Sequence, residues 1–560
     1  MGTEYWNGAE AAHRRVMMKA AGYSDKDIRK KPHIGVPNSY MAGSPGTAHL
    51  RQVTEAVKEG IWAAGGIPVE FGIPATCGNV ANGADEMKYE QVGRDIVAMS
   101  IEFVSRIHNF DAICCVASCD LIIAGCYLAA CRLDIPALVV TGGSMQAGNY
   151  CGKTVVEADL DAARFSGASE AELFEMEESV CPSFGACPSM GTANTMQMLG
   201  EVLNLVMPGT STIPASDNAR LRAARTAGKY MVQLARSGKT PKDLITKDVL
   251  ENAIMFDMAV AGSTNAVLHI LAYAYELGIK LTLADFEKYA KEIYCINAVI
   301  PSGPYTVVDF HYAGGVKQVM KQLAGKIHTD APTIYGDTTW GELLDSVKSA
   351  PNKVIHSLED PVAKEPGLKI MRGNISPAGA IVRPTAVYEE VKYIKGAAKV
   401  YECDQDAYRA IMAGEIVAGD ILVIRYEGCK GAPGMKELML SIDALIGLGL
   451  DKKVGLITDA RFSGFNYGAI VGHVSPEAYD GGVIALIENG DEIEMDIAGG
   501  TVNLLVSDEI LAERRKSWVR PPLKQQKGVL NIYAQNCRPA EEGGAMQPWA
   551  LDADYGYHHE

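Results

Sequence analysis

Short apolar runs alternate with amphipathic stretches along the first third of the chain. Residues 48–64 and 90–108 carry apolar side chains at helical spacing, which predicts two helices. Apolar runs typical of buried strands lie at residues 33–37, 68–73, 112–117 and 137–141. Strands and helices that alternate in this order are typical of a doubly wound α/β domain, so we expect a parallel sheet covered by helices on both faces.

The pattern changes twice further along the chain. Residues 217–236 and 284–294 have helical spacing, and a polar connector bounded by prolines follows at 351–366. After it, we expect short strands separated by glycine turns at residues 379–382, 398–401, 420–425, 454–458, 482–487 and 501–506. Recurrent short strands favour a β-barrel or sandwich. The sequence therefore predicts an N-terminal α/β domain over residues 1–365 and a C-terminal β-barrel domain over 366–560, with a surface tail from Gln535.

Composition narrows the class of protein. The chain has 560 residues, 48% of them hydrophobic, which predicts a globular protein with more than one core. Its net charge of -16 argues against binding to nucleic acid or to an anionic membrane surface. Thirteen cysteines, several of them in apolar segments, indicate reduced thiols and hence a cytoplasmic protein. Neither a secretory leader nor a membrane span is expected.

Two cysteines stand at positions that favour chemistry over packing. Cys119 and Asp120 follow the strand predicted at 112–117, and ligands of doubly wound folds bind beyond the carboxyl ends of strands. Cys187 lies in a turn-rich run that leads into an apolar helical pattern. Thiolates with a nearby carboxylate suit an iron cluster beside an oxygen-bound cation. The alternative is that these thiols are simply packed, because cysteine is among the most buried residue types.

Three further residues are candidates for catalysis or binding. Glu427 stands where a predicted strand meets a glycine-rich loop, a position suited to a metal or to a substrate hydroxyl, although a solvated turn carboxylate fits it too. Ser463 stands at a tight turn after a strand, where many serines are ordinary turn residues. His49 is flanked by turn residues and suits acid/base work or a phosphate contact, or else a structural role.

Taken together, these motifs resemble the family of dihydroxy-acid, phosphogluconate and sugar-acid dehydratases, from about Trp6 to Trp518. The matching runs begin with residues 58–71 and the Cys119-Asp120 pair. They continue with Gly142-Gly-Ser144-Met145, Gly185-Ala-Cys187, residues 192–196, 262–265 and 373–377, Arg425-Tyr-Glu427-Gly428, residues 433–435, Arg461-Phe-Ser463-Gly464 and residues 472–477.

The resemblance implies a hydro-lyase that converts a 2,3-dihydroxy acid or sugar acid into a 2-keto-3-deoxy acid. It implies an iron–sulfur cluster on three cysteines as a Lewis acid for the leaving hydroxyl, and Mg²⁺ near the carboxylate. Ser463 would take the C2 proton. Cys119, Cys187, Asp120 and Glu427 would ligate metal, and Ser144, Arg461 and His49 would bind substrate. A homodimer or a dimer of dimers is also implied.

The chain departs from the family pattern at three ligand positions. Gly46 stands where the family has a cluster cysteine, Gly78 where it has a magnesium-binding Asp, and Leu121 where it has a lysine. Cys77 adjoins one of these positions and is a further thiol. Two alternatives to the dehydratase therefore stay open. One is a cluster-free relative with isomerase or proton-transfer chemistry, and the other is a non-catalytic partner protein.

Overall fold

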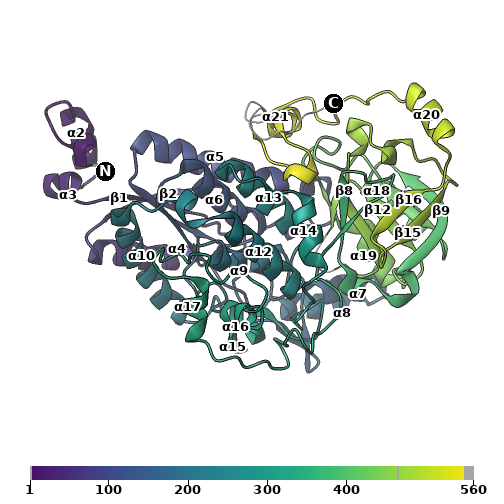
Figure 1. Cartoon of the computed structure of the whole chain (residues 1–560), viewed down its shortest axis with the longest axis horizontal. Coiled ribbons are helices and arrows are strands. Elements are labelled where there is room, and N and C mark those ends of the chain that lie inside the picture. The colour runs from purple at the N-terminus through teal and green to yellow at the C-terminus, as the bar shows by residue number, and fades with distance from the viewer. Residues whose placement is uncertain (1–2, 463–465, 548–560) are drawn as a thin grey trace.

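The computed structural model describes residues 3–462 and 466–547. Figure 1 shows an N-terminal part, coloured purple to teal, beside a C-terminal part, coloured green to yellow. No helix in these described ranges is both long and apolar enough to cross a bilayer.

A four-stranded parallel sheet forms the centre of the N-terminal part. Its order is β2 (Ile67–Gly72), β1 (His33–Asn38), β3 (Ala112–Ala117) and β4 (Ala137–Thr141). Helices α4 (Leu50–Ala63) and α10 (Ala219–Ser237) pack with Ile34 and Val36 on one face. Helices α5 (Tyr89–His108) and α6 (Asp120–Leu133) pack with Ile113 and Cys115 on the other. The predicted doubly wound α/β domain is confirmed, because helices cover both faces of a parallel sheet.

Helices α4 and α10 approach each other closely at two glycines. A Cβ on Gly60 would lie 2.1 Å from the backbone oxygen of Arg225, and one on Gly228 would lie 2.2 Å from that of Val57. Neither position has room for a side chain, since the obstructing atoms belong to the backbone of the facing helix. The sequence places both glycines inside predicted helices, where glycine is otherwise unfavourable.

Gly60→Ala should therefore lower the stability by about 1–3 kcal/mol, although alanine is the better helix former. Thermal unfolding measures the change. Gly93→Ala is the matched control, because Gly93 lies in α5 with no atom within 4 Å of a Cβ. It should raise stability by about 0.5–1 kcal/mol. Equal effects of the two substitutions would contradict the proposed close approach.

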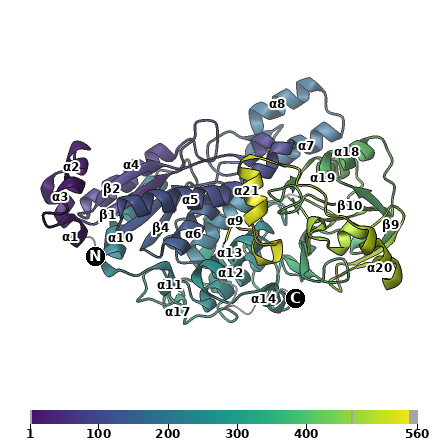
Figure 2. The same ribbon diagram turned by 90° about the horizontal axis from the view of Figure 1, so that it is seen from above.

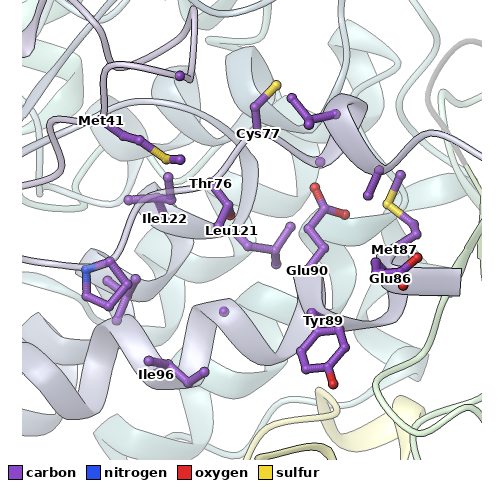
Figure 3. A pocket seen from close by; sticks show the side chains of 17 residues that line it. Met41, Thr76, Cys77, Glu86, Met87, Tyr89, Glu90, Ile96, Leu121 and Ile122 are labelled. Atoms are coloured by element: carbon purple, nitrogen blue, oxygen red, sulfur yellow. The ribbon is translucent and has the colours of Figure 1, made fainter. Parts of the chain in front are cut away.

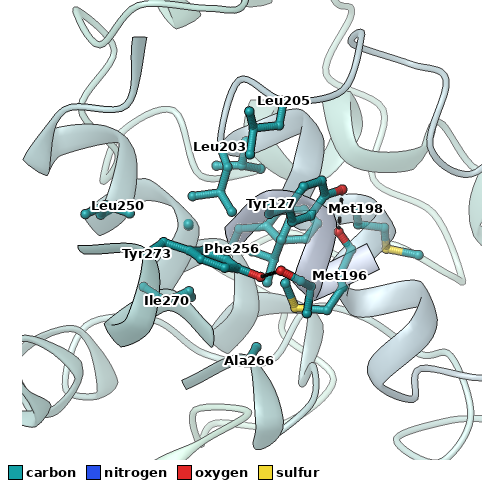
Figure 4. Close-up of a cluster of buried hydrophobic side chains, with 14 of the residues drawn as sticks. Tyr127, Met196, Met198, Leu203, Leu205, Leu250, Phe256, Ala266, Ile270 and Tyr273 are labelled. Atoms are coloured by element: carbon teal, nitrogen blue, oxygen red, sulfur yellow. Dashed lines mark hydrogen bonds between the residues drawn. The ribbon is translucent and has the colours of Figure 1, made fainter. Parts of the chain in front are cut away.

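A layer of helices continues this part behind α6. Helices α9 (Thr192–Val202) and α13 (Asn265–Leu277) pack on α6, and α12 (Lys247–Val260) packs on both of them. All three helices bury most of their side chains. Figure 4 shows Tyr127 and Tyr273 within this core, where the Tyr127 hydroxyl donates to the Met196 carbonyl at 3.1 Å. The Tyr273 hydroxyl donates to the Ala124 carbonyl at 3.0 Å. Buried tyrosines usually need such partners, so these bonds fix α6 against α9 and α13.

An eight-stranded sheet forms the C-terminal part and closes on itself. Its order is β16 (Thr501–Leu504), β15 (Glu492–Asp496), β9 (Tyr393–Tyr401), β10 (Ile421–Ile424), β12 (Gly455–Thr458), β14 (Ala469–Ser475), β8 (Gly379–Val382) and β7 (Lys369–Met371). A bridge between Arg372 and Thr501 joins the two ends, and the Val502 amide donates to the Arg372 carbonyl at 2.7 Å. The predicted β-barrel is therefore confirmed. The predicted boundary at residue 365 stays a prediction.

The remaining elements of the described residues connect these layers or cover them. The helices are α1 (Thr3–Trp6), α2 (Ala12–Ala20), α3 (Asp25–Lys30), α7 (Glu157–Phe165), α8 (Glu170–Val180), α11 (Pro241–Leu244), α14 (Leu283–Ala290), α15 (Val307–Tyr312), α16 (Gly315–Gln322), α17 (Trp340–Asp345), α18 (Asp404–Met412), α19 (Leu440–Gly447), α20 (Asp508–Ser517) and α21 (Gly528–Asn536). The short strands are β5 (Gly148–Tyr150), β6 (Lys153–Val155), β11 (Glu437–Leu438) and β13 (Arg461–Phe462).

One predicted strand is wrong. The run at residues 482–487 forms the short helix η6 (Val483–Leu486), with the side chains of Ile484, Ala485 and Leu486 buried. A short apolar run that is buried on all sides shows no period, so the sequence pattern does not separate a strand from a buried helical turn.

The tail also differs from the predicted surface extension, because its residues 543–547 are buried. The Arg94 side chain on α5 donates to the carbonyls of Gly543 at 3.0 Å and Gly544 at 2.8 Å. The Met546 amide donates to Asp95 at 2.8 Å. Helix α21 contacts α5, and Figure 2 shows it beside one end of that helix. The buried Arg94–Asp95 pair needs hydrogen-bond partners, and the tail backbone supplies them. Residues 548–560 of the predicted tail lie outside the described residues.

The two parts of the chain meet where α7 contacts α19 (Figure 2). Asp443 of α19 lies close to Asp161 of α7, and burial together with that negative charge raises the pKa of Asp443 to about 8. A carboxyl group whose pKa is higher in the folded state than in the unfolded state favours folding only while it is protonated. This contribution is lost as the pH rises from about 4 to about 8.

Asp443→Asn stays neutral at every pH, so its stability advantage over the wild-type chain should grow between pH 5 and pH 8.5. We expect a gain of about 1 kcal/mol or more at pH 8.5, because one unit of pKa shift corresponds to about 1.4 kcal/mol. Thermal unfolding at the two pH values measures it. Glu415→Gln removes an exposed acid and serves as the control. A gain that does not depend on pH would contradict the assignment.

Candidate active site

Cys119 and Asp120 lie at the carboxyl end of β3, where the chain turns into α6. Cys119 has a φ of 68°, in the left-handed region that a residue with a side chain rarely adopts. Asp120 is the first residue of α6. The structure thus places both residues at the edge of the parallel sheet where ligands of such folds bind.

Cys187 lies in the loop between α8 and α9, and backbone bonds hold this loop to the chain after β4. The Met145 amide donates to the Ala186 carbonyl at 2.8 Å, and the Ala186 amide donates to that of Gly143 at 2.9 Å. The Asn194 side chain donates to the Cys187 carbonyl at 2.5 Å. The Cys187 thiol lies beside Asn79, whose side-chain nitrogen is 3.6 Å away, and beside the carboxyl group of Glu157.

Three thiols and two carboxyl groups line one small cavity of about 20 Å³ between these loops. The thiols belong to Cys77, Cys119 and Cys187, and the carboxyl groups to Glu90 and Asp120. A hydrogen bond between the Cys77 and Cys119 thiols lowers the pKa of Cys77 to about 7 and raises that of Cys119. Cys77 directly precedes the short helix η1 (Gly78–Ala81) and lies on the wall between this cavity and a larger one.

Of the positions that depart from the family pattern, Gly78 and Leu121 line the same cavity, and Gly46 lies beside Cys119 in its wall. A Cβ on Gly46 would lie 2.2 Å from the Cys119 sulfur, and a Cβ on Gly78 would lie 2.1 Å from a Glu90 carboxylate oxygen. The Cys119 sulfur and the Glu90 carboxylate therefore occupy the space that side chains at positions 46 and 78 would take. Leu121 is buried and adds an apolar wall to both cavities.

Arg461 binds two of the neighbouring carboxylates at once. It lies on β13, which pairs with β11 so that Arg461 stands opposite Glu437. Its guanidinium donates to Glu90 at 3.0 Å, to Glu437 at 3.0 Å and to the Met435 carbonyl at 2.8 Å. Burial raises the pKa of Glu437 to about 7, against the opposing effect of Arg461. Burial, followed by the charges of Glu90 and Glu437, raises the pKa of Asp120 well above its usual range.

This donor set fits one of the two implied cofactors. Three thiols around one cavity match a thiolate-bound iron–sulfur cluster in number and in kind. Magnesium does not fit, because it needs near-octahedral oxygen ligands and Arg461 already engages both Glu90 and Glu437. Asp120 alone does not supply such a shell.

Glu427 lies apart from this cavity in the described structure. Its carboxylate accepts from the Asp404 amide at 3.3 Å and stands 4.0 Å from the Lys524 ammonium. Burial raises the pKa of Glu427 to about 7. Glu427 is not among the described residues that line either cavity, and its metal role stays a prediction.

Two of the predicted substrate-binding residues are engaged with the surrounding loops. The His49 ring bonds to the Gly142 carbonyl at 2.9 Å and stacks on Phe184 with centroids 4.7 Å apart. Burial lowers the pKa of His49 to about 4, so its ring is neutral. The Ser144 hydroxyl donates to the Met145 carbonyl at 3.1 Å. Both side chains position the loop of Cys187, and their contact with substrate stays a prediction. Ser463 lies outside the described residues.

Sequence reasoning missed Glu90 and Glu437. Glu90 is one acid in the first turn of a helix, a common position for acids, and nothing in its neighbourhood marks it. Glu437 follows the glycine-rich loop by a few residues and could have been found as an acid at a loop-to-strand junction, the same signal that singled out Glu427. Only the fold brings both carboxylates to Arg461.

A larger cavity of about 380 Å³ borders the cavity of the thiols (Figure 3). Its walls are mostly apolar, and its described lining residues are Met41, Gly43, Pro74, Thr76, Cys77, Gly78, Val80, Ala81, Glu86, Met87, Tyr89, Glu90, Gly93, Ile96, Val97, Leu121 and Ile122. The charged residues among them are Glu86 and Glu90, and these described lining residues include no lysine or arginine. A volume of this size holds a small organic acid.

Comparisons with known proteins match nearly the whole chain. The family described as dihydroxy-acid/6-phosphogluconate dehydratase matches with its N-terminal domain over residues 31–342 and with its C-terminal domain over residues 353–544. A dihydroxy-acid dehydratase of Caldanaerobacter subterraneus subsp. tengcongensis is 42% identical over 96% of this chain and 98% of its own length. A dihydroxy-acid dehydratase of Ignicoccus hospitalis is 43% identical over the same shares. One of Pyrococcus abyssi is 42% identical, again over 96% and 98%.

Proposed function

Because the chain belongs to the dihydroxy-acid/6-phosphogluconate dehydratase family, we propose that it is a hydro-lyase acting on a 2,3-dihydroxy carboxylic acid. The reaction breaks the C2–H and C3–O bonds and releases water. The resulting enol becomes a 2-keto-3-deoxy acid. Hydroxide is a poor leaving group and the C2 proton is weakly acidic, so both steps need assistance.

The residues of the site divide this work. Cys77, Cys119 and Cys187 would hold an iron–sulfur cluster, which supplies a Lewis acid for the departing hydroxyl when it is bound. Arg461 fixes the Glu90 carboxylate at the wall of the larger cavity, where it accepts a hydrogen bond from a substrate hydroxyl. Ser463 is the next residue in the sequence after β13, and it would accept the C2 proton. The apolar wall formed by Leu121 and Ile122 excludes water from the carbon chain.

The residues that line the larger cavity support a proposal for the class of substrate. A phosphate group is normally bound by arginine, lysine or a cluster of backbone amides. The described lining residues offer neither cation, and their charged side chains are acidic. An apolar chamber next to carboxylates and thiols therefore favours a short aliphatic dihydroxy acid over a phosphorylated sugar acid.

A substrate panel tests this proposal. Anaerobically prepared protein is assayed for 2-keto acid with a branched aliphatic 2,3-dihydroxy acid, an unphosphorylated sugar acid and 6-phosphogluconate. We expect the aliphatic acid to be turned over with a kcat/KM at least about tenfold above that of the phosphorylated acid, a difference of about 1.4 kcal/mol. Equal or higher turnover of 6-phosphogluconate would contradict the substrate class.

The same panel separates the two alternatives. Binding of the acids without any keto acid would favour a cluster-free relative with isomerase or proton-transfer chemistry. Absence of both binding and turnover would favour a non-catalytic partner protein.

We also propose a homodimer or a dimer of dimers in a reducing compartment such as the cytoplasm. Helix α5 exposes Met99, Phe103 and Ile107 at intervals of four residues, and such a row of apolar side chains supports an association surface. The thirteen cysteines are all free thiols, which supports a reducing compartment. Light scattering of the purified chain measures the oligomeric state, and a monomer at micromolar concentration would contradict the proposal.

A further inference from the structure

We propose that Cys77 supplies the third thiolate of an iron–sulfur cluster bound together with Cys119 and Cys187. Cys77 would then take over from the side chain that is missing at position 46. The inference concerns binding alone and holds whether or not the chain is a dehydratase.

The space beside position 46 is already filled by the Cys119 sulfur. The Cys119 sulfur lies 2.2 Å from where a Cβ on Gly46 would be, so it fills the room that a longer residue would need. The loop that carries Gly46 is fixed there, because the Gly185 amide donates to the Pro45 carbonyl at 2.9 Å. The chain thus closes this side of the cavity with Cys119 itself, and a third thiol has to come from another wall.

Cys77 stands on such a wall. It lines the small cavity together with Cys119 and Cys187, and among these three it is the one that also lines the larger cavity of about 380 Å³. The small cavity is too narrow for a cluster, and the adjoining cavity supplies the missing room next to Cys77. None of the other ten cysteines is among the described residues that line either cavity.

The spacing of the sulfurs distinguishes a cluster from a single ion. Thiolates on one tetrahedral zinc ion, with Zn–S bonds of about 2.3 Å, stand about 3.8 Å apart. In the described ranges, only Asp248, Glu251 and His328 bring three ligand atoms within 4.8 Å of one another. At least one pair of the three thiols therefore stands more than 4.8 Å apart, which is wider than a single tetrahedral ion requires and is expected when the thiols bind different iron atoms of a cluster.

The neighbouring polar groups suit a thiolate-bound centre. The Asn79 side chain directs its nitrogen toward the Cys187 sulfur at 3.6 Å. Hydrogen bonds to ligating sulfurs orient them and stabilise their negative charge. Each of the three thiols loses its proton to solvent when iron and sulfide bind. A [2Fe–2S] cluster assembled from ferric iron and sulfide keeps the oxidation state of its iron, so assembly requires no oxidant.

Reconstitution of the full chain with ferric iron and sulfide under anaerobic conditions tests the proposal. Iron and sulfide per chain and the visible absorption spectrum are measured for the wild-type chain, Cys77→Ser, Cys119→Ser and Cys181→Ser. We expect Cys77→Ser and Cys119→Ser to lose at least about tenfold in bound iron and sulfide. Cys181→Ser should match the wild type, because Cys181 is exposed and lies outside both cavities. Full loading of Cys77→Ser, or no loading of the wild-type chain, would overturn the proposal.

Alkylation of the unmutated chain gives a second readout that does not depend on how a variant folds. Iodoacetamide labelling followed by mass spectrometry compares the chain before and after reconstitution. We expect Cys77, Cys119 and Cys187 to become protected while the exposed Cys151 and Cys181 stay reactive. Unchanged labelling of Cys77 in a chain that has bound iron would exclude it as a ligand.

The keto acid assay separates this inference from the proposed function. A chain that binds the cluster through Cys77 but forms no keto acid would leave the inference standing and remove the function. Keto acid formation by a chain without bound iron would support the function and remove the inference of a bound cluster.

Discussion

Arg461→Met should lower the stability of the chain by about 3–5 kcal/mol and reduce keto acid formation at least about 100-fold. The guanidinium is fully buried and binds Glu90 and Glu437, each at 3.0 Å. Its removal leaves two buried carboxylates without their partner, which costs more than the pair itself contributes. It also releases Glu90 from the wall of the larger cavity, and a displacement of about 1 Å at such a site costs about 100-fold in rate. Thermal unfolding and the keto acid assay measure the two effects.

Two further variants check the cause. Arg461→Lys keeps the positive charge, but lysine has no planar guanidinium that can bind both carboxylates at once. The stability and the keto acid formation of this variant should therefore lie between those of the wild type and of Arg461→Met. Arg409→Met removes an arginine whose side chain is 70% exposed and pairs with Asp406, and it should cost no more than about 1 kcal/mol. Equal losses from Arg461→Met and Arg409→Met would show that burial of the pair is not the reason.

Gly185→Ala should destabilise the chain by at least about 3 kcal/mol and expose Cys187. Gly185 has a φ of +123°, and a Cβ there would lie 2.4 Å from the Met145 backbone nitrogen. The strained φ costs about 1–2 kcal/mol, and overpacking against a fixed backbone adds about 1–3 kcal/mol. The contact holds the loop of Cys187 against the chain after β4, so the loop should move. Thermal unfolding measures the stability, and alkylation rates measure the exposure of Cys187.

Gly152→Ala is the matched control for this substitution. Gly152 has a φ of +81°, and no atom lies within 4 Å of its Cβ position. Gly152→Ala should therefore lower the stability only by the cost of the strained φ, about 1–2 kcal/mol, and should leave the reactivity of Cys187 unchanged. If the two variants cost the same, the close approach of Gly185 to Met145 has no energetic role.

The elements that could be predicted from the sequence are those with a clear pattern and clear ends. The strands predicted at 112–117 and 137–141 match β3 and β4 residue for residue, because apolar residues make up nearly all of both runs and turns bound them. The helix predicted at 90–108 matches α5 within one residue. The apolar run at 482–487 has no period, and burial on all sides made it helical rather than extended.

The candidate site was predicted only in part. The strand-to-loop position of Cys119 and Asp120 followed from the βαβ pattern, and the structure places them there. Their neighbours did not follow from the sequence. Glu90, Glu437 and Arg461 are separated by up to 371 positions along the chain, and no local pattern reports that they form one ion-pair network.

The sequence by itself determined the two-part architecture and the place of Cys119 at the sheet edge, and its resemblance to the family identified the three positions without the expected ligands. The architecture and the place of Cys119 follow from periodicity and from residue identity, which are local properties. Only the tertiary structure decided which groups fill the space that side chains at positions 46 and 78 would take. These groups are the Cys119 sulfur and the Glu90 carboxylate. The tertiary structure also placed Cys77 beside Cys119 and Cys187. The physical reason is that cavities are bounded by residues from different elements, and their packing depends on all of them at once.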